Sequence, residues 1–283
     1  NKYEYYHDFE NYLLIGTDAT GNNKNGADYQ GSMADFLMLV IVDKTENTYS
    51  FLQFNRDTMT EVALIDHNGE GEATANIQLC TAHWYGGNRE QSCENTVKSV
   101  KKLLGGIQID GYYELNMSEI PKLNSMVDGV TVTLEDDFSK KYPKMKKGAT
   151  INLDDEQAYA YVHDRYGVGD EENASRMKRQ QQYMTGFFKK LQEKVKANPN
   201  YANEVFESLQ DVSTTDITIG KISNISNIFA SGTDKGIFQL AGKSKIGQAL
   251  GDEMDHMEFY VNKKAMVSTM SELFGIVEQK NKE

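Results

Sequence analysis

The pattern of apolar and polar positions predicts adjacent β-strands over residues 11–55. Residues 11–16 (NYLLIG) form a short apolar segment that ends at a glycine, which is typical of a buried strand. Residues 35–43 (DFLMLVIVD) form an almost continuous apolar run, which indicates a strand buried on both faces. Residues 49–55 (YSFLQFN) form the next strand. Because only residues 44–48 connect the last two strands, we expect an antiparallel hairpin.

Apolar residues recur at helical spacing farther along the chain, and polar, glycine-containing loops are expected at residues 17–32 and 61–72. The sequence holds no repeat and no low-complexity tract. It therefore predicts one mixed α/β domain over residues 1–283, with a partly antiparallel sheet. The predicted helices cover residues 92–104 (ended by Gly105-Gly106), 118–127, 154–163, 174–196 and 264–274, and further strands cover residues 130–134 and 257–261.

The composition changes the predicted fold little, but it argues against some classes of binding partner. The chain has 283 residues, a net charge of -12 and 39% hydrophobic residues. This acidic balance argues against broad binding to nucleic acid or to an anionic membrane surface. No run of about 18 apolar residues exists, so we expect no membrane span within the chain. The chain begins with Asn1 rather than an initiator methionine, so we expect a piece of a longer protein, with any anchor upstream.

Arginine is scarce, and its distribution suggests a binding site. Only five of the 30 basic residues are arginines, and three of them fall within residues 165–179. Arg176 and Arg179 lie three apart on a predicted helix, Gln180 follows, and Arg165 lies in the preceding loop. Guanidinium forks and the start of a helix suit a pyrophosphate. The alternative is a solvated face whose charge is balanced by the acidic residues of the same loop.

The predicted hairpin brings two carboxylates and an arginine together. Asp35 begins one strand and Arg56 follows the other, so both should lie at one edge of the sheet. Asp18 follows the first strand and should reach the same edge. Two carboxylates held close together repel each other unless a positive charge lies between them, and Mg²⁺ accepts one or two carboxylates together with substrate phosphates. The alternative is that these aspartates only cap loops.

The two cysteines leave two possibilities open. Cys80 and Cys93 are separated by 12 residues and could close a disulfide loop in an oxidising compartment. They could equally be two buried thiols, which is common for free cysteine.

Seven short segments, in order along residues 11–190, together resemble the landmarks of the LytR-CpsA-Psr family. That family carries a strand that runs into a Gly-Ser-Asp-like turn, an Arg-Ser-Asp-Thr segment before an apolar strand, and a strand that ends in Pro-Arg-Asp-Thr. Short motifs in a fixed order are more specific than any one alone. The matching segments are Gly16-Thr17-Asp18, residues 33–36 (MADF), 55–58 (NRDT), 83–87 (HWYGG), 127–132 (VDGVTV), 158–165 (AYAYVHDR) and 176–180 (RMKRQ).

The resemblance implies a central mixed sheet flanked by helices, with an apolar channel for a polyprenyl chain. It implies a Mg²⁺-dependent phosphotransferase that attaches a polyprenyl-pyrophosphate-linked glycopolymer, of the teichoic acid or capsular type, to peptidoglycan. It also implies an extracellular location with one membrane helix upstream, a compartment that would suit a disulfide between Cys80 and Cys93. Asp18 and Asp35 would bind the metal. The implied catalytic residues are Arg56, Asp57, Arg165, Arg176 and Arg179, and the implied substrate contacts are Arg56, Gln78, His163, Arg165, Arg176, Arg179 and Gln180.

Four departures from the family pattern keep other functions open. Met33, Gln78 and His163 stand where the family has positively charged residues, and Asn173 stands where it has an aspartate that Asp170 could replace. Fewer charges around the phosphates would weaken substrate binding. The chain could therefore be a binding protein without transferase activity, or a pyrophosphatase in which water replaces the sugar acceptor. The remaining arginine, Arg89, is expected to stand apart on the surface.

Overall fold

The structure is a computed structural model that describes residues 3–4, 7–18, 29–275 and 277–278. Within these residues, no helix is long and apolar enough to cross a membrane. The chain divides into two compact units that alternate along the sequence, whereas the sequence predicts a single domain. Unit 1 comprises residues 1–115, 213–221 and 232–283, and unit 2 comprises residues 116–212 and 222–231.

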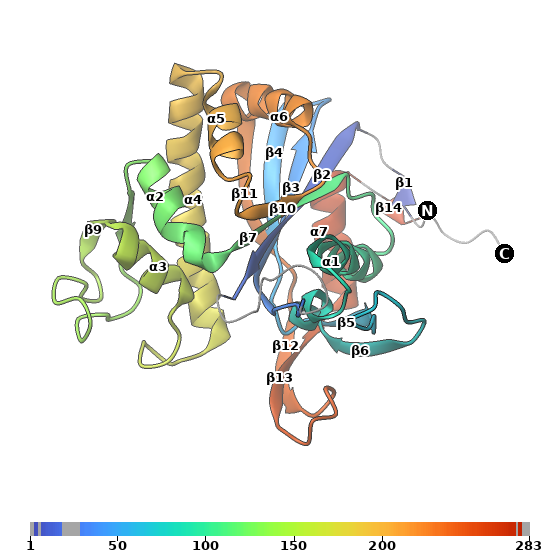
Figure 1. The fold of residues 1–283 in the computed structure, drawn as a ribbon. Coiled ribbons are helices and arrows are strands. Elements are labelled where there is room, and N and C mark those ends of the chain that lie inside the picture. The colour runs from blue at the N-terminus through green and yellow to red at the C-terminus, as the bar shows by residue number, and fades with distance from the viewer. Residues whose placement is uncertain (1–2, 5–6, 19–28, 276, 279–283) are drawn as a thin grey trace. The chain divides into compact units, whose positions relative to one another are not determined.

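Unit 1 is built on a six-stranded sheet (Figure 1). Strands β2, β3 and β4 pair antiparallel, as the short connection of residues 44–48 predicts for β3 and β4, and β11 pairs parallel with β4. The sheet is therefore mixed, which confirms the predicted fold class. Its order is β10 (Ser213–Thr215), β7 (Gly111–Asn116), β2 (Phe9–Thr17), β3 (Ala34–Asp43), β4 (Thr48–Gln53) and β11 (Thr233–Gln239).

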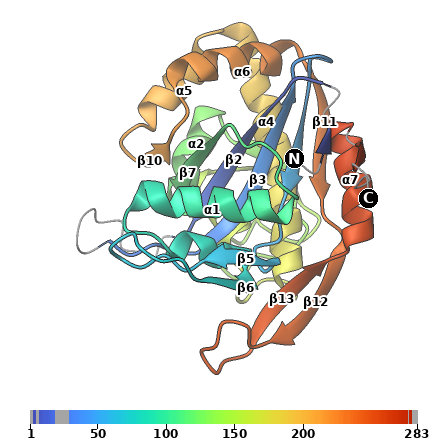
Figure 2. The ribbon, with the colours of Figure 1, turned by 90° about the vertical axis from the view of Figure 1, so that its right-hand side faces the viewer.

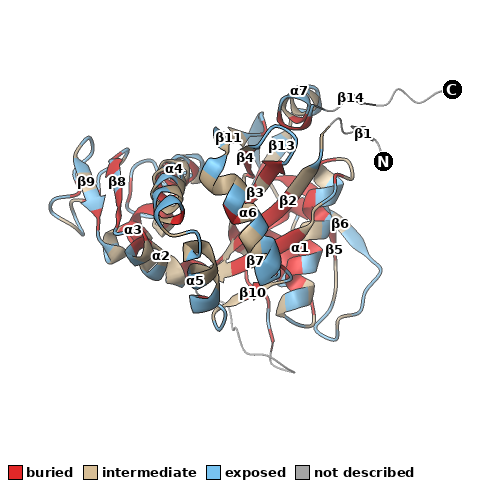
Figure 3. Ribbon diagram, turned by 90° about the horizontal axis from the view of Figure 1, so that it is seen from above, coloured by how far each residue is buried: buried red, intermediate tan, exposed pale blue. Residues whose placement is uncertain are grey.

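One face of this sheet packs against two helices, α1 (Arg89–Leu103) and α7 (Lys263–Phe274). Strand register places Leu13 opposite Leu39, and both are fully buried in the cluster that includes Val100 of α1. Buried strands run through the centre of the unit (Figure 3). Burial of about 25 cal/mol per Å² of apolar surface is the main favourable contribution to holding these layers together.

The helix α1 begins and ends as its sequence predicts. The side chain of Asn88 accepts a hydrogen bond from the backbone of Gln91, which caps the first turn. Gly105 and Gly106 end the helix with positive φ angles of 76° and 94°, a conformation that favours glycine.

Three further two-stranded sheets belong to unit 1. The segment expected to be an exposed loop at residues 61–72 is instead partly a hairpin, in which β5 (Met59–Ala63) pairs with β6 (Thr74–Gln78). A short 3-10 helix, η1 (Leu79–Trp84), follows it. The ribbon of β12 (Gly242–Gly247) and β13 (His256–Val261) is visible in Figure 2. The third sheet joins β1 (Tyr3–Glu4) to β14 (Val277–Glu278).

Unit 2 has its own core, formed by helices and one hairpin. Tyr161 and Tyr183 are almost completely buried there, together with Phe187 and Val130. α3 starts at a capping box in which Asp154 and Gln157 bond to each other's backbone N–H. The elements are η2 (Met117–Glu119), α2 (Ile120–Met126), β8 (Val130–Thr133), β9 (Thr150–Leu153), α3 (Asp155–His163), α4 (Asn173–Ala197) and α5 (Tyr201–Ser208), and α6 (Ile219–Ser231) begins in unit 1 and ends in unit 2.

Candidate functional site

Asp18 and Asp35 lie at the same end of two neighbouring strands of unit 1. β2 and β3 pair so that Thr17 faces Ala34. Asp18 follows directly, and its backbone N–H donates to the carbonyl of Met33 at 3.1 Å. Asp35 is the second residue of β3 and is buried, with 7% of its surface exposed. The strand register thus brings the backbone at Asp18 next to the start of β3, which carries Asp35. The sequence predicts that both aspartates lie at this edge of the sheet.

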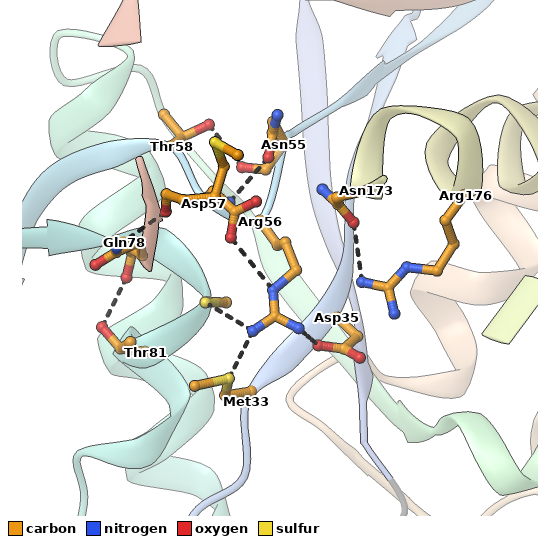
Figure 4. A network of polar contacts seen from close by, with 12 residues as sticks. Met33, Asp35, Asn55, Arg56, Asp57, Thr58, Gln78, Thr81, Asn173 and Arg176 are labelled. Atoms are coloured by element: carbon orange, nitrogen blue, oxygen red, sulfur yellow. Dashed lines mark hydrogen bonds and ion pairs between the residues drawn. The ribbon is translucent and has the colours of Figure 1, made fainter. Parts of the chain in front are cut away.

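Arg56 follows β4 and contacts four side chains around it (Figure 4). Its Nη1 donates to Asp35 Oδ1, and its Nε lies 3.6 Å from Asp57 Oδ1. Its Nη2 donates to the sulfur atoms of Met33 and Cys80, at 3.4 Å for Cys80. Burial works against the charge on Arg56, but its interactions with Cys80, Asp35 and Asp57 outweigh burial and raise its pKa. Arg56 is therefore a permanent cation between two carboxylates.

Hydrogen bonds within the turn and from two other segments hold residues 55–58 in place. Asn55 Oδ1 accepts from the backbone of Asp57 at 2.9 Å, an Asx-turn contact. The carbonyl of Arg56 accepts from the N–H of Cys80 at 2.9 Å, and that of Asp57 from the N–H of Phe259 at 2.8 Å. Because the turn is fixed on both sides, the backbone that carries Arg56 and Asp57 has little freedom to move.

The family resemblance implies that Gln78 contacts the substrate. In the structure, its side chain forms a hydrogen bond within the protein. Its Nε2 donates to the carbonyl of Met257 on β13 at 3.0 Å, and the residue is 2% exposed. In this structure Gln78 links the β6 end to the β12–β13 ribbon.

A buried carboxylate that the sequence did not suggest lies beside the strand that carries Asp18. Glu114 on β7 is 1% exposed, and it accepts hydrogen bonds from Thr17 Oγ1 at 2.8 Å and from Arg89 Nη2 at 3.3 Å. The prediction that Arg89 stands apart on the surface is therefore wrong. Its side chain is 18% exposed and pairs with Glu114, because a buried carboxylate needs a positive partner.

The expected disulfide is absent, and this expectation is wrong for the structure. Cys80 and Cys93 are both free and buried. Each thiol has its own polar neighbour: Cys80 Sγ accepts from Arg56, and Cys93 Sγ lies 3.7 Å from His83 Nε2. Burial raises the pKa of Cys80 to about 11 and that of Cys93 well above its usual value. Both thiols are therefore protonated at neutral pH.

In unit 2, two side chains of α4 bind the carbonyl groups at the end of α3. Arg179 is 1% exposed; its Nε donates to the carbonyl of Tyr161 at 2.8 Å and its Nη2 to that of Asp164. Its Nη1 donates to Asp136 Oδ2 at 2.5 Å, and Gln180 Nε2 donates to the carbonyl of Val162 at 3.1 Å. The last carbonyls of a helix have no partner within it, and Arg179 and Gln180 supply one. Asp136 is a partner that the sequence did not suggest.

The other predicted residues of unit 2 surround the α3–α4 connection. Arg176 is 4% exposed, and its Nη2 donates to Asn173 Oδ1 at 2.9 Å (Figure 4). Arg165 is half-buried, and its guanidinium lies 4.6 Å from the ring centre of Tyr166. His163 Nδ1 lies 3.2 Å from Asp164 Oδ1. Asp170, the possible replacement for the missing family aspartate, accepts from the N–H of Glu172 at 2.9 Å and from Ser175 Oγ at 2.8 Å.

A protein-only metal site is not present among the residues that the structure describes, since no three His, Cys, Asp or Glu side chains are grouped there to bind an ion. Asp18 and Asp35 offer two carboxylates, and Arg56 already donates to one oxygen of Asp35. Mg²⁺ in phosphate sites is bound by one or two carboxylates, with phosphate and water oxygens completing the shell. The two aspartates therefore fit a Mg²⁺ that arrives with a pyrophosphate.

The chain is similar to known proteins over almost its whole length. The model of the LytR_cpsA_psr family matches residues 2–274. A search of curated proteins found no match.

Several solved structures share the fold. A Streptococcus agalactiae protein has a TM-score of 0.75 and 21% identity, covering 96% of this chain and 90% of that one. TagV of B. subtilis has a TM-score of 0.70 and 20% identity, covering 95% and 98%. TagT bound to LI-WTA has a TM-score of 0.68 and 21% identity, covering 95% and 91%.

Proposed function

Because this chain belongs to the LytR_cpsA_psr family, we propose that it transfers a glycopolymer from a polyprenyl pyrophosphate to peptidoglycan. The family is one of glycopolymer–peptidoglycan transferases. The observation that carries the proposal for this chain is the cluster of Asp18, Asp35 and Arg56 at one end of the sheet in unit 1. TagT bound to LI-WTA supports a wall glycopolymer as the donor class.

In the proposed reaction, a sugar hydroxyl of peptidoglycan attacks the phosphorus that carries the glycopolymer. The new phosphorus–oxygen bond forms as the bond to polyprenyl phosphate breaks, and that leaving group takes the electron pair. Arg56 balances the charge that develops on the phosphate oxygens, and Asp57, 3.6 Å from Arg56 Nε, accepts the proton of the hydroxyl. Mg²⁺, when bound by Asp18 and Asp35, would neutralise the pyrophosphate further.

Unit 2 contains proposed phosphate contacts of its own. Arg165, Arg176 and His163 are the proposed pyrophosphate ligands, and Arg176 would exchange its bond to Asn173 for a phosphate oxygen. Arg179 and Gln180 are better assigned as positioning residues, because they bind the end of α3 from which Arg165 follows. We also propose that the domain acts on the outer face of the membrane, anchored by an upstream helix, since peptidoglycan lies there.

Binding without transfer is the second candidate, and two observations favour it. Met33 contacts Arg56 where the family pattern has a positive charge. Gln78 stands at another such position and donates to a backbone carbonyl. A site with fewer positive charges can still hold a pyrophosphate while stabilising its transition state less.

Turnover of a short polyprenyl-pyrophosphate-linked sugar by the chain with Mg²⁺ tests the proposal. Asp18→Asn and Asp35→Asn should each lower kcat by about 100-fold or more, since each removes charge that acts on the transition state. The matched control is Asp211→Asn, an exposed aspartate of unit 2, which should leave kcat unchanged. Thermal unfolding of all three variants separates loss of chemistry from loss of fold.

The destination of the labelled phosphate distinguishes the candidates. Label in peptidoglycan indicates transfer, whereas label in a free sugar phosphate indicates that water is the acceptor. Tight binding of the donor with no turnover in the unaltered chain would reject the transferase proposal and leave the binding function.

A further inference from the structure

Unit 1 contains a groove of about 520 Å³ between the last turns of α1 and the β5–β6 hairpin. It is lined by Lys98, Lys101 and Lys102 of α1 and by Glu61 of β5. Lys102 Nζ lies 3.4 Å from Glu61 Oε1, so this pair neutralises itself. Within the part of the chain that the structure describes, Lys98 and Lys101 have no acidic partner, and both are exposed. Three lysines and one glutamate therefore leave the groove with two positive charges in a chain whose net charge is -12.

The wall of the groove also contains a polar group without a partner. Ser99 lies between the lysines and is 1% exposed, and its buried hydroxyl has no hydrogen-bond partner among the described residues. Buried hydroxyl groups are normally bonded, so this hydroxyl is a donor that the described part of the protein does not use. Gly106 borders the same groove, and no atom lies within 4 Å of the position that a Cβ would occupy there. The groove thus combines space, positive charge and an unused donor.

Helix α1 runs from contacts beside the candidate site, at its first residue, to the groove, at its last turns. This helix has 15 residues, which corresponds to about 22 Å. At its first residue, Arg89 pairs with Glu114, and Glu114 accepts from Thr17, the residue before Asp18. Lys98 and Lys101 therefore lie roughly 14–18 Å along the helix from Arg89, whose contacts hold the Asp18 strand. A small anion cannot reach both places, but a polymer can.

We propose that this groove is a second subsite, which binds a phosphate-bearing region of the glycopolymer chain at a distance from the reacting pyrophosphate. The inference rests on the proposed transferase function and extends it to a polyanionic substrate. Lys98 and Lys101 bind successive phosphodiester oxygens, and the hydroxyl of Ser99 donates to a nearby sugar or phosphate oxygen. Lysine suits this role, because its flexible point charge follows a repeating chain without demanding one geometry.

Binding of poly(glycerol phosphate) of about ten repeats, long enough to span the roughly 22 Å of α1, tests the subsite directly. The double variant Lys98→Gln/Lys101→Gln should bind it about threefold to tenfold more weakly, as expected for two exposed ion pairs. The matched control is Lys189→Gln/Lys196→Gln, which removes two exposed lysines of α4 and should bind like the unaltered chain. Affinity should fall as salt rises, and uncharged dextran of equal length should not bind.

Three results would overturn the subsite. Equal weakening in both double variants would mean that only net charge matters. Inorganic phosphate that binds as well as the polymer would indicate a simple anion site. Preference for phosphatidylglycerol vesicles over the polymer would assign the groove to lipid headgroups.

Kinetics with short and long donors separate this inference from the proposed function. The groove variant should raise KM for a donor that carries the phosphate polymer and leave the single-sugar donor unchanged. Equal kinetics on both donors would reject the subsite while the transferase stands. No turnover of either donor, with polymer binding still dependent on Lys98 and Lys101, would reject the transferase while the subsite stands.

Discussion

His83 and Cys93 form a buried pair of neutral groups inside unit 1. His83 is 3% exposed, its Nδ1 lies 3.0 Å from the carbonyl of Ser32, and its Nε2 faces the Cys93 thiol. The carbonyl can only accept, so Nδ1 carries the proton and Nε2 is left to accept from the thiol. Burial lowers the pKa of His83, Glu114 acts to raise it, and Arg89 acts to lower it. The folded chain therefore prefers the neutral imidazole.

This preference predicts a loss of stability in mild acid. The pKa of His83 is about 6.5 in the unfolded chain and lower in the folded chain. The stability that depends on the neutral ring is complete above pH 6.5 and is lost as the pH falls toward the folded pKa, by at most about 1.4 kcal/mol per pH unit. Urea unfolding at pH 7.5 and 5.5 should show a smaller difference for His83→Gln than for the unaltered chain. His67→Gln, at an exposed histidine, should keep the full difference, and an unchanged difference in His83→Gln would contradict the assignment.

The free thiols make a second prediction at this scale. Cys80 and Cys93 are inaccessible in the folded chain, so a thiol reagent should react with neither until the protein unfolds. In unreduced protein unfolded by urea, titration should give two thiols per chain. A result of zero thiols would restore the disulfide that the spacing allowed.

The sequence predicts contacts between site residues that lie in one local hairpin, but it does not predict contacts between residues that lie far apart in the chain. Asp35 and Arg56 belong to one local hairpin, so strand pairing alone predicts that they meet. Glu114 contacts Thr17 across 97 positions of sequence, and Arg179 contacts Asp136 across 43. Neither pair leaves a local pattern, because each partner is supplied by a different element. Arg89 was misplaced for the same reason.

At the scale of elements, helices were more predictable than strands. Apolar spacing and capping residues place α1, α3, α4 and α7 within a few residues of their bounds. β10 has three residues and β11 is mostly exposed, so neither shows the alternation of a half-buried strand. These edge strands are held by backbone pairing with β7 and β4, which their own residues do not reveal.

The contact between α3 and α4 predicts a large effect of one substitution. Arg179→Lys keeps a positive charge near Asp136 but loses the fork that binds the carbonyls of Tyr161 and Asp164. The free energy of unfolding in urea should fall by about 2–4 kcal/mol, because buried acceptors lose their donors. The neighbouring exposed residue provides the control, and Lys178→Gln should change stability by less than about 0.5 kcal/mol. A similarly small change in Arg179→Lys would show that these bonds contribute little.

At the scale of the whole molecule, the fold is retained although most residues differ from those of its structural relatives. The relatives described above share 20–21% of their residues with this chain, with TM-scores from 0.68 to 0.75. Cores tolerate extensive change when volume and pattern are kept. Within that shared fold, the neutral residue Met33 contacts Arg56, and the neutral residue Gln78 donates to the carbonyl of Met257. Function must therefore be tested at these positions, because fold alone does not determine it.

The parallel pairing of β11 with β4 affects the order in which the molecule can be completed during synthesis. A ribosome delivers β4 first, and residues 54–232 must follow before β11 emerges to cover that edge. All of unit 2 is made during this interval, while the β4 edge stays open to other strands. Pairing across so long a stretch of chain is intrinsically slow. The nascent protein thus passes through a period of exposure to aggregation that the finished molecule does not show.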